Sequence, residues 1–190
     1  MSGKRERVLD AAIEVLGTRG LRGLTHRAVD EVAGIPQGST SNYFRTRESL
    51  LEAVMHRLVE RDREDWSALA AVPTPASVDE FVDGMAAFVR SATGPDRIRT
   101  AARYALVVAA VAEPALAAPL GRARGELLSW ATGLLAGLGA AEPERECRIL
   151  ADYVDGMILH QLSTPAAQFD PSGEIETLAR ALFGADSGCP

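Results

Sequence analysis

Residues 24–50 read LTHRAVDEVAGIPQGSTSNYFRTRESL, and this stretch decides the fold. Thr25 is a favourable N-cap, and Val29 and Val32 follow at helical spacing, which predicts a short helix. Gly34 can adopt the left-handed conformation that ends a helix, and the proline two residues later cannot continue it. The pattern therefore predicts a short helix followed by a tight turn.

Residues 37–43 are small, polar and uncharged apart from the final tyrosine. A helix packed in a core rarely has this composition, whereas a helix that offers hydrogen-bonding groups to base edges often does. Thr46 is placed to cap a further helix, with Glu48 in its first turn near the positive end of the helix dipole. The two short helices and the glycine turn between them predict a helix-turn-helix.

The start of the chain also resembles a known family. The residues that carry the resemblance are Thr25, Ala33-Gly34-Ile35, Gly38 and Tyr43-Phe44-Arg45-Thr46-Arg47-Glu48-Ser49-Leu50-Leu51. They are similar to the DNA-binding domain of the tetracycline-repressor (TetR/AcrR) family, over about the first 57 residues. Ser41 stands where that family commonly has tyrosine, and Arg47 where it usually has lysine.

The resemblance implies a two-domain regulator. Residues 1–48 would form the helix-turn-helix DNA-binding domain, and residues 49–190 a helical effector-binding and dimerisation domain. Its partners would be a near-palindromic double-stranded DNA operator, a second copy of the chain and a small-molecule effector. The expected function is that of a ligand-responsive transcriptional regulator, most often a repressor in this family.

The residues expected to contact DNA fall into two groups. Those facing bases would come from the second helix, because Asn and Gln suit bidentate contacts with adenine and Gly38 permits close approach. Those holding phosphates would lie at helix N-termini and around the motif. The base-facing candidates are Gln37, Gly38, Ser39, Thr40, Ser41 and Asn42. The phosphate candidates are Thr25, His26, Arg27, Tyr43, Arg45 and Arg47.

Composition predicts an all-α protein. The 190 residues are 47% hydrophobic and only 5% aromatic, and Ala and Leu are abundant, which favours helices over strands. About nine helices are expected, at residues 3–19, 26–33, 37–43, 47–66, 78–92, 96–112, 114–138, 143–162 and 172–183. Within these, Pro119 predicts a kink or split, and the apolar run 104–112 would require burial on all sides.

Charge is distributed unevenly along the chain, whose net charge is −6. Residues 1–57 hold nine Lys/Arg and seven Asp/Glu, whereas residues 58–190 hold eleven and nineteen. A head of net charge +2 would be attracted to DNA while a body of −8 would be repelled, which favours binding in one orientation.

Two cysteines far apart indicate neither a disulfide framework nor a metal site, and no stretch is long and apolar enough to span a bilayer. A cytoplasmic protein without membrane contact is therefore expected.

Large side chains in the body are candidates for an effector pocket, although plain core packing is the alternative for each. These candidates are Trp66, Phe81, Met85, Phe88, Tyr104, Val108, Trp130, Tyr153 and Asp155. A dimer through the last two helices is expected, because the final helix is short and apolar and the preceding one is apolar on more than one face. The interface candidates are Tyr153, Met157, Leu178, Leu182 and Phe183.

Motifs for catalysis, phosphate binding or metal ligation are not recognised in the sequence, so no catalytic residue, metal or cofactor is expected. Two alternatives stay open. One is a small helical enzyme or ligand-binding protein with a coincidental helix-turn-helix. The other is a regulator that responds to a protein partner or to nothing.

Overall fold

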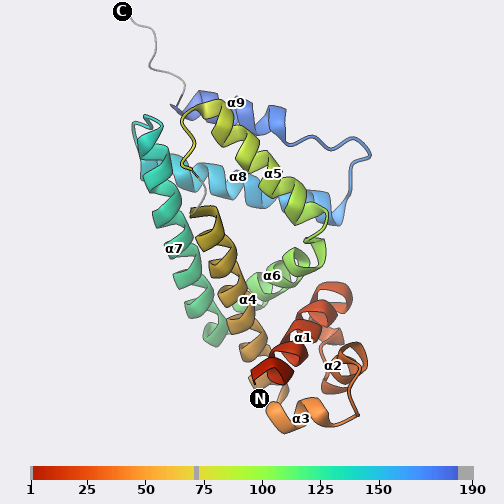
Figure 1. Cartoon of the computed structure of the whole chain (residues 1–190). Helices are drawn as coiled ribbons and strands as arrows, with labels where there is room; N and C mark the ends of the chain where they lie inside the picture. Colours follow the sequence, from red (N-terminus) through yellow and green to blue (C-terminus); the bar gives the residue numbers. More distant parts are fainter. Residues whose placement is uncertain (1, 71–72, 184–190) are drawn as a thin grey trace, which may run out of the picture. The chain divides into compact units, whose positions relative to one another are not determined.

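The computed structural model describes residues 2–70 and 73–183, and every regular element in these residues is an α-helix (Figure 1). The elements in chain order are α1 (Ser2–Gly23), α2 (His26–Ala33), α3 (Ser39–Tyr43), α4 (Arg47–Ala70), α5 (Val78–Thr93), α6 (Arg97–Ala110), α7 (Pro114–Gly137), α8 (Pro143–Ser163) and α9 (Ser172–Phe183). The predicted all-α class with nine helices is confirmed for the described residues. Within the same ranges, no helix is long and apolar enough to cross a membrane.

The chain forms two compact units. The first contains residues 1–66 and 96–123, and the second contains residues 67–95 and 124–190. The helices α4 and α7 each continue from one unit into the other, and α6 belongs with the N-terminal helices. The predicted domain division after residue 48 stays a prediction.

The core of the first unit is built from α1, which contacts both α2 and α6. Its inner face is formed by Val8, Leu9, Ala12, Ile13, Val15 and Leu16, all buried. Gly20 has a φ of 67°, so the backbone leaves helical geometry there before one more turn continues to Gly23. The helix was predicted to stop before Gly20, and the glycine produces a break at that point but not the end of the element.

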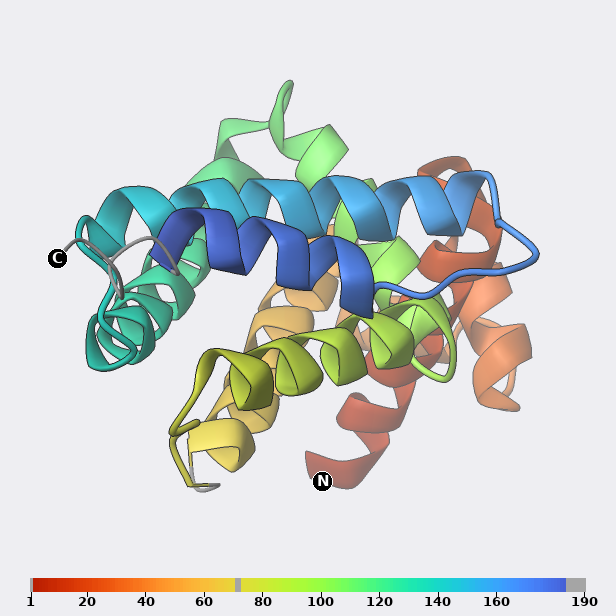
Figure 2. The same ribbon diagram turned by 90° about the horizontal axis from the view of Figure 1, so that it is seen from above.

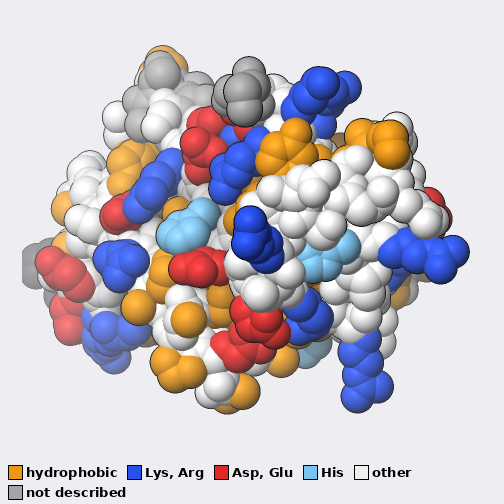
Figure 3. Space-filling model, turned by 90° about the horizontal axis from the view of Figure 1, so that it is seen from below, with side chains coloured by type: hydrophobic (Ala, Val, Ile, Leu, Met, Phe, Trp, Pro, Cys, Tyr) orange, Lys and Arg blue, Asp and Glu red, His pale blue; other side chains and the backbone are white. Residues whose placement is uncertain are grey.

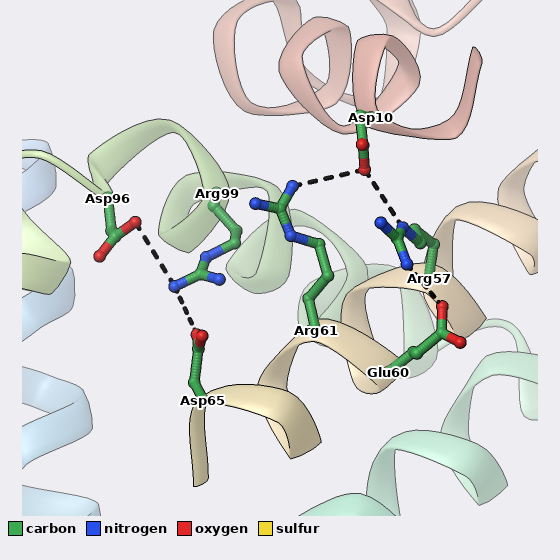
Figure 4. Close-up of polar contacts among 7 residues, drawn as sticks. All are labelled: Asp10, Arg57, Glu60, Arg61, Asp65, Asp96 and Arg99. Carbon is green, nitrogen blue, oxygen red and sulfur yellow. Dashed lines mark hydrogen bonds and ion pairs between the residues drawn. The ribbon is translucent and has the colours of Figure 1, made fainter. Parts of the chain in front are cut away.

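Ion pairs join α4 to α1 and α6 inside this unit (Figure 4). On the α1 side, Asp10 accepts hydrogen bonds from Arg57 at 3.2 Å and Arg61 at 3.4 Å. On the α6 side, Arg99 lies 2.7 Å from the Asp65 carboxylate, and Arg103 donates two hydrogen bonds to the buried Asp62. Residues 57–65 of α4 are thereby bound to two other helices.

The second unit is built around α5, α8 and α9, which lie side by side (Figure 2). Ile175 and Ala179 on α9 are fully buried. The rings of Phe81 on α5 and Phe183 on α9 meet edge to face, with centroids 5.8 Å apart. Ile175 and Ala179 of the apolar side of α9 are therefore buried within their own chain, whereas Leu178, Leu182 and Phe183 are half-buried.

Two details of the sequence prediction differ from the structure. The α7 helix continues through Pro119, so it is not split there, and the alternative expectation of a kink stays a prediction. Proline there removes the donor to the Ala115 carbonyl, and Ala115 is exposed, where water can bind that group. The expectation that residues 104–112 are buried on all sides is wrong, because Val108 is 68% exposed and Val111, just after α6, is 89% exposed.

Candidate nucleic-acid interface

The first helix of the motif is capped as its sequence predicts. The Thr25 side chain accepts a hydrogen bond from the Ala28 backbone N–H at 3.2 Å, which starts α2. Gly34 ends this helix in the left-handed region, with φ 62° and ψ 37°. Its N–H donates to backbone carbonyl oxygens of the last turn. Both helix boundaries follow from local chemistry.

The second helix of the motif is shorter than predicted. Gly38 has a φ of 87° and forms the N-cap, so α3 begins at Ser39 and Gln37 lies in the turn. The Ser39 and Ser41 hydroxyls donate to the backbone carbonyls of Pro36 and Gly38. The outward surface of the turn and helix includes the exposed residues Pro36, Gln37, Gly38, Ser41, Asn42 and Tyr43.

One predicted base-facing residue points inward. The Thr40 side chain is fully buried, and its hydroxyl donates to the Asp30 carboxylate at 2.6 Å. Asp30 also accepts the backbone N–H groups of Thr40 at 2.8 Å and Gly38 at 2.7 Å. Burial of Asp30 raises the pKa of its carboxyl, but the hydrogen bonds from Thr40 and Gly38 outweigh it, so the pKa lies below its ordinary value. Thr40 therefore holds α3 in place and does not face a base.

His26 is likewise engaged within the motif. Its Nε2 atom lies 2.6 Å from the backbone carbonyl oxygen of Phe44, and the side chain is half-buried. A carbonyl oxygen accepts, so Nε2 carries the proton and donates. The phosphate contact predicted for His26 stays a prediction. In the structure, its Nε2 atom is hydrogen-bonded to the Phe44 carbonyl oxygen.

Basic side chains surround the motif. Arg27, Arg45 and Arg47 are exposed, and Arg47 also donates to the Leu21 carbonyl oxygen at 2.6 Å. In the view from the α3 side, uncharged groups cover much of this surface, with Lys and Arg side chains around them and some Asp and Glu side chains beside them (Figure 3). An uncharged hydrogen-bonding centre with cations around it suits a DNA groove between two phosphate backbones.

A surface hollow lies beside this motif, between α1 and α4. Arg5, Tyr43, Phe44 and His56 are among the side chains that line it. The Arg5 guanidinium lies over the Phe44 ring, 5.2 Å from its centroid, which is cation–π geometry. This contact holds one cation of the N-terminal basic segment next to the end of α3.

Sequence reasoning missed the role of Asp30 as a support of α3. The signal for Asp30 is its position, because a charged residue next to Val29 falls on the buried face of a short amphipathic helix. A buried carboxylate needs donors. The backbone of the following turn is the nearest source of them.

The effector-pocket candidates lie in both units. Phe81 is buried against Phe183, whereas Met85, Tyr104 and Trp130 are half-buried and Phe88 and Val108 are exposed. The side chain of Trp66 lies outside the described residues. A pocket formed by these residues stays a prediction.

Asp155, one of the effector-pocket candidates, and Asp152 on the same helix are both ion-paired and partly exposed. Arg124 on α7 donates to Asp152 and to Asp155 on α8, each at 2.6 Å. The Asp155 side chain is 46% exposed. The two acids join α7 to α8, so a free buried carboxylate for a cationic ligand is not found at either position.

The interface candidates divide into inward and outward residues. Met157 is buried, and Phe183 contacts Phe81 within the chain, while Leu178 and Leu182 are half-buried. Tyr153 is exposed, and its hydroxyl donates to Glu174 of α9 at 3.0 Å. Desolvation of the Tyr153 phenol raises its pKa, and the hydrogen bond to Glu174 and the negative charge of that carboxylate raise it further. Participation of these residues in a dimer stays a prediction.

The α2–turn–α3 arrangement in an all-helical chain defines a helix-turn-helix protein. Residues 8–54 match the family model described as bacterial regulatory proteins, tetR family. Residues 76–185 match the tetracyclin repressor-like C-terminal domain, which covers more than half of the chain. The chain therefore belongs to the tetracycline-repressor family.

Two curated relatives match part of the chain. The HTH-type transcriptional regulator BetI of Rhizobium meliloti (strain 1021) is 30% identical over 82 residues, 43% of this chain and 39% of BetI. The HTH-type transcriptional repressor KstR2 of Rhodococcus jostii (strain RHA1) is 34% identical over 59 residues, 31% of this chain and 29% of KstR2. The chain thus spans well under half the length of either relative in these matches.

Solved structures resemble the chain over nearly its full length. A transcriptional regulator from Rhodococcus sp. Rha1 has a TM-score of 0.78 at 21% identity, covering 98% of this chain and 99% of that one, which shows the fold. The multidrug binding protein EbrR, complexed with ethidium, has a TM-score of 0.68 at 30% identity, covering 94% and 98%.

Proposed function

We propose that this protein is a DNA-binding transcriptional regulator that places α3 in the major groove. The observation that carries the proposal is the α3 surface, where Ser41, Asn42 and Tyr43 are exposed. The helix is held in place by the buried Asp30 carboxylate, which accepts the Thr40 backbone N–H. Side-chain amides and hydroxyls are the groups that read base edges there. Family membership supports the same function.

Phosphate contacts orient the helix on the duplex in this proposal. Arg27, Arg45 and Arg47 are exposed around the motif, and the Thr25 hydroxyl lies at the N-terminus of α2. Phosphate contacts supply affinity and strong salt dependence but little sequence preference. The net negative charge of residues 58–190 opposes binding through the remainder of the chain.

The regulator acts as a homodimer through α8 and α9. Ile149 and Tyr153 lie four residues apart on α8 and are 37% and 39% exposed, so one face of this helix leaves large apolar groups in water. The Tyr153–Glu174 hydrogen bond connects this face to α9. A two-fold partner would bury it in a four-helix bundle, and two α3 helices would meet successive major grooves of a near-palindrome, roughly 34–36 Å apart.

A small effector controls DNA binding in this proposal. The α4 helix begins at Arg47, directly after the motif, and ion pairs from Asp62 and Asp65 join it to α6. A ligand that displaces either helix would change the placement of α3. The coupling is typically about 1–3 kcal/mol, limited by the difference in ligand affinity between the two states. The similarity to EbrR, complexed with ethidium, supports a ligand-responsive body.

The test starts with selection of bound fragments from random duplex DNA by the purified full-length protein. A near-palindromic consensus, with half-sites about one helical turn apart, is the expected result. Compounds are then screened for release of the selected duplex. Failure to enrich any sequence at low salt would contradict the DNA-binding proposal, and an operator that no compound releases would contradict the effector part alone.

A further inference from the structure

The α3 helix is too short to be stable by its own hydrogen bonds. It spans Ser39–Tyr43, and isolated helices of fewer than about 12–15 residues are marginal in water. Its N-cap is Gly38, which offers no capping side chain. The orientation of α3 must therefore be set by groups outside it.

The N-terminal end of α3 is held by Asp30 of α2. Its carboxylate accepts the Gly38 and Thr40 backbone N–H groups and the Thr40 hydroxyl, all within 2.8 Å. Asp30 is 1% exposed, so water does not compete for these donors. The negative charge also lies at the end of α3 where unpaired N–H groups favour an anion.

The C-terminal end of α3 is held by His26, which lies on α2 as Asp30 does. Its Nε2 atom donates to the carbonyl oxygen of Phe44, the residue that ends α3, at 2.6 Å. The Phe44 ring is buried, and its backbone N–H donates to the Thr40 carbonyl oxygen at 3.0 Å. This end is therefore held by one hydrogen bond and one buried ring.

The two supports have matching spacing. His26 and Asp30 are four residues apart and share one face of α2. The residues that they hold, Thr40 and Phe44, are also four apart. One face of α2 thus holds both ends of α3, and the exposed Ser41 and Asn42 lie between the two attachment points.

We infer that His26 and Asp30 together are positioning residues that set the orientation of α3, and hence determine which base sequence the protein prefers. This inference rests on the proposed DNA-binding function. Loss of either support lets α3 tilt about the other, which moves Ser41 and Asn42 relative to base edges. The exposed arginines lie outside α3 and keep their phosphate contacts, so non-specific affinity is retained.

The test measures a ratio of affinities. The operator is first selected with the wild-type protein, and the Kd is then measured at one salt concentration for the operator and for a scrambled duplex of equal length. In Asp30→Asn the amide keeps the shape of the side chain, but an N–H₂ group replaces one of the two oxygens that accept from Gly38 and Thr40. In His26→Leu the bond to Phe44 is lost. Each variant is expected to lose at least 10-fold in preference for the operator, with less than threefold change on scrambled DNA.

Two milder variants keep the result interpretable if either change unfolds the chain. His26→Gln retains an amide donor near the Phe44 carbonyl and is expected to preserve most of the preference. Thr40→Val removes the hydroxyl but leaves both backbone donors to Asp30, and is expected to lose the preference partially. Asp10→Asn is the matched control, because this carboxylate binds α4 to α1 and makes no contact with α3.

Folded Asp30→Asn and His26→Leu proteins with an unchanged ratio would overturn the inference, as would equal losses on both duplexes. These outcomes differ from failure of the proposed function, in which the wild-type protein itself selects no sequence.

Discussion

Gly17 of α1 and Ile98 of α6 approach so closely that a Cβ atom on Gly17 would lie 2.0 Å from the Ile98 carbonyl oxygen. That distance leaves no room for any side chain, and the obstructing atom belongs to backbone. The absence of a side chain at Gly17 therefore permits α6 to pack on α1, the contact that brings residues 96–123 into the same unit as the N-terminal helices.

Gly17→Ala is expected to destabilise the chain, because α1 and α6 must move apart to admit the methyl group. Overpacking of this kind costs about 1–3 kcal/mol, and the backbone obstacle places it at the upper end. Gly84→Ala in α5 is the matched control, since open space surrounds that position and alanine favours the helix by about 0.5–1 kcal/mol. Urea unfolding of both variants measures the difference, and equal stability of the two would contradict the prediction.

Asp62→Asn should be strongly destabilising, because it leaves Arg103 without the buried carboxylate to which it donates two hydrogen bonds. Breaking a buried pair by removing one partner costs about 3–5 kcal/mol, and partial exposure of Arg103 places this case near 3 kcal/mol. Glu142→Gln breaks the exposed pair with Arg145 and should cost about 0–1 kcal/mol. Thermal unfolding of both variants tests the contrast, and similar shifts in Tm would refute it.

Acid should weaken the fold partly through Asp30. Its pKa is lower in the folded chain than its ordinary value, so the ionised carboxylate stabilises the fold at neutral pH. This stabilisation is lost as the pH falls below about 4 and through the folded pKa, because protonation then favours the unfolded chain. The difference in unfolding free energy between wild type and Asp30→Asn should therefore shrink from pH 6 to pH 3. Glu144→Gln, an exposed charge on α8, controls for loss of net charge, and parallel curves for wild type and Asp30→Asn would contradict the prediction.

Arg47→Ala should weaken binding to every duplex alike. Arg47 is exposed beside the motif, and loss of one phosphate contact reduces the slope of log K against log salt by about 1. Arg145→Ala, an exposed arginine of α8, should leave that slope unchanged. Titrations of selected and scrambled duplexes at several salt concentrations provide the measurement. A change in base preference at one position would show that Arg47 reads a base.

Ile149→Glu should produce monomers that retain their helical content but bind the operator weakly. Its side chain is exposed on the α8 face proposed for the dimer, so a charge there disrupts association without entering the core. Phe183→Glu acts differently, because its ring contacts Phe81 inside the chain, and it should lower the Tm as well. Sedimentation at micromolar concentration separates the cases. A wild-type chain that sediments as a monomer would remove the dimer from the proposal.

Local chemistry made the helix-turn-helix predictable from sequence. Thr25 caps α2 because its hydroxyl can accept a backbone N–H of the first turn. Gly34 ends α2 because a residue without a Cβ adopts the left-handed conformation easily. Neither role depends on distant residues. The same holds for Ser77, which accepts the Glu80 N–H at the start of α5. The sequence predicts the start of α3 two residues early, because the Gly38 N–H is bound not within the helix but by Asp30, eight residues away.

The sequence by itself determined the all-helical class, the order of the helices and the family, because periodicity, capping and the motif are properties of neighbouring residues. Only the tertiary structure decided which side chains of the motif face outward. Thr40 and His26 are polar residues in a DNA-binding pattern, yet both are engaged within the chain by partners 10 and 18 residues away. Burial and long-range hydrogen bonding depend on how helices pack against one another, which no local pattern encodes.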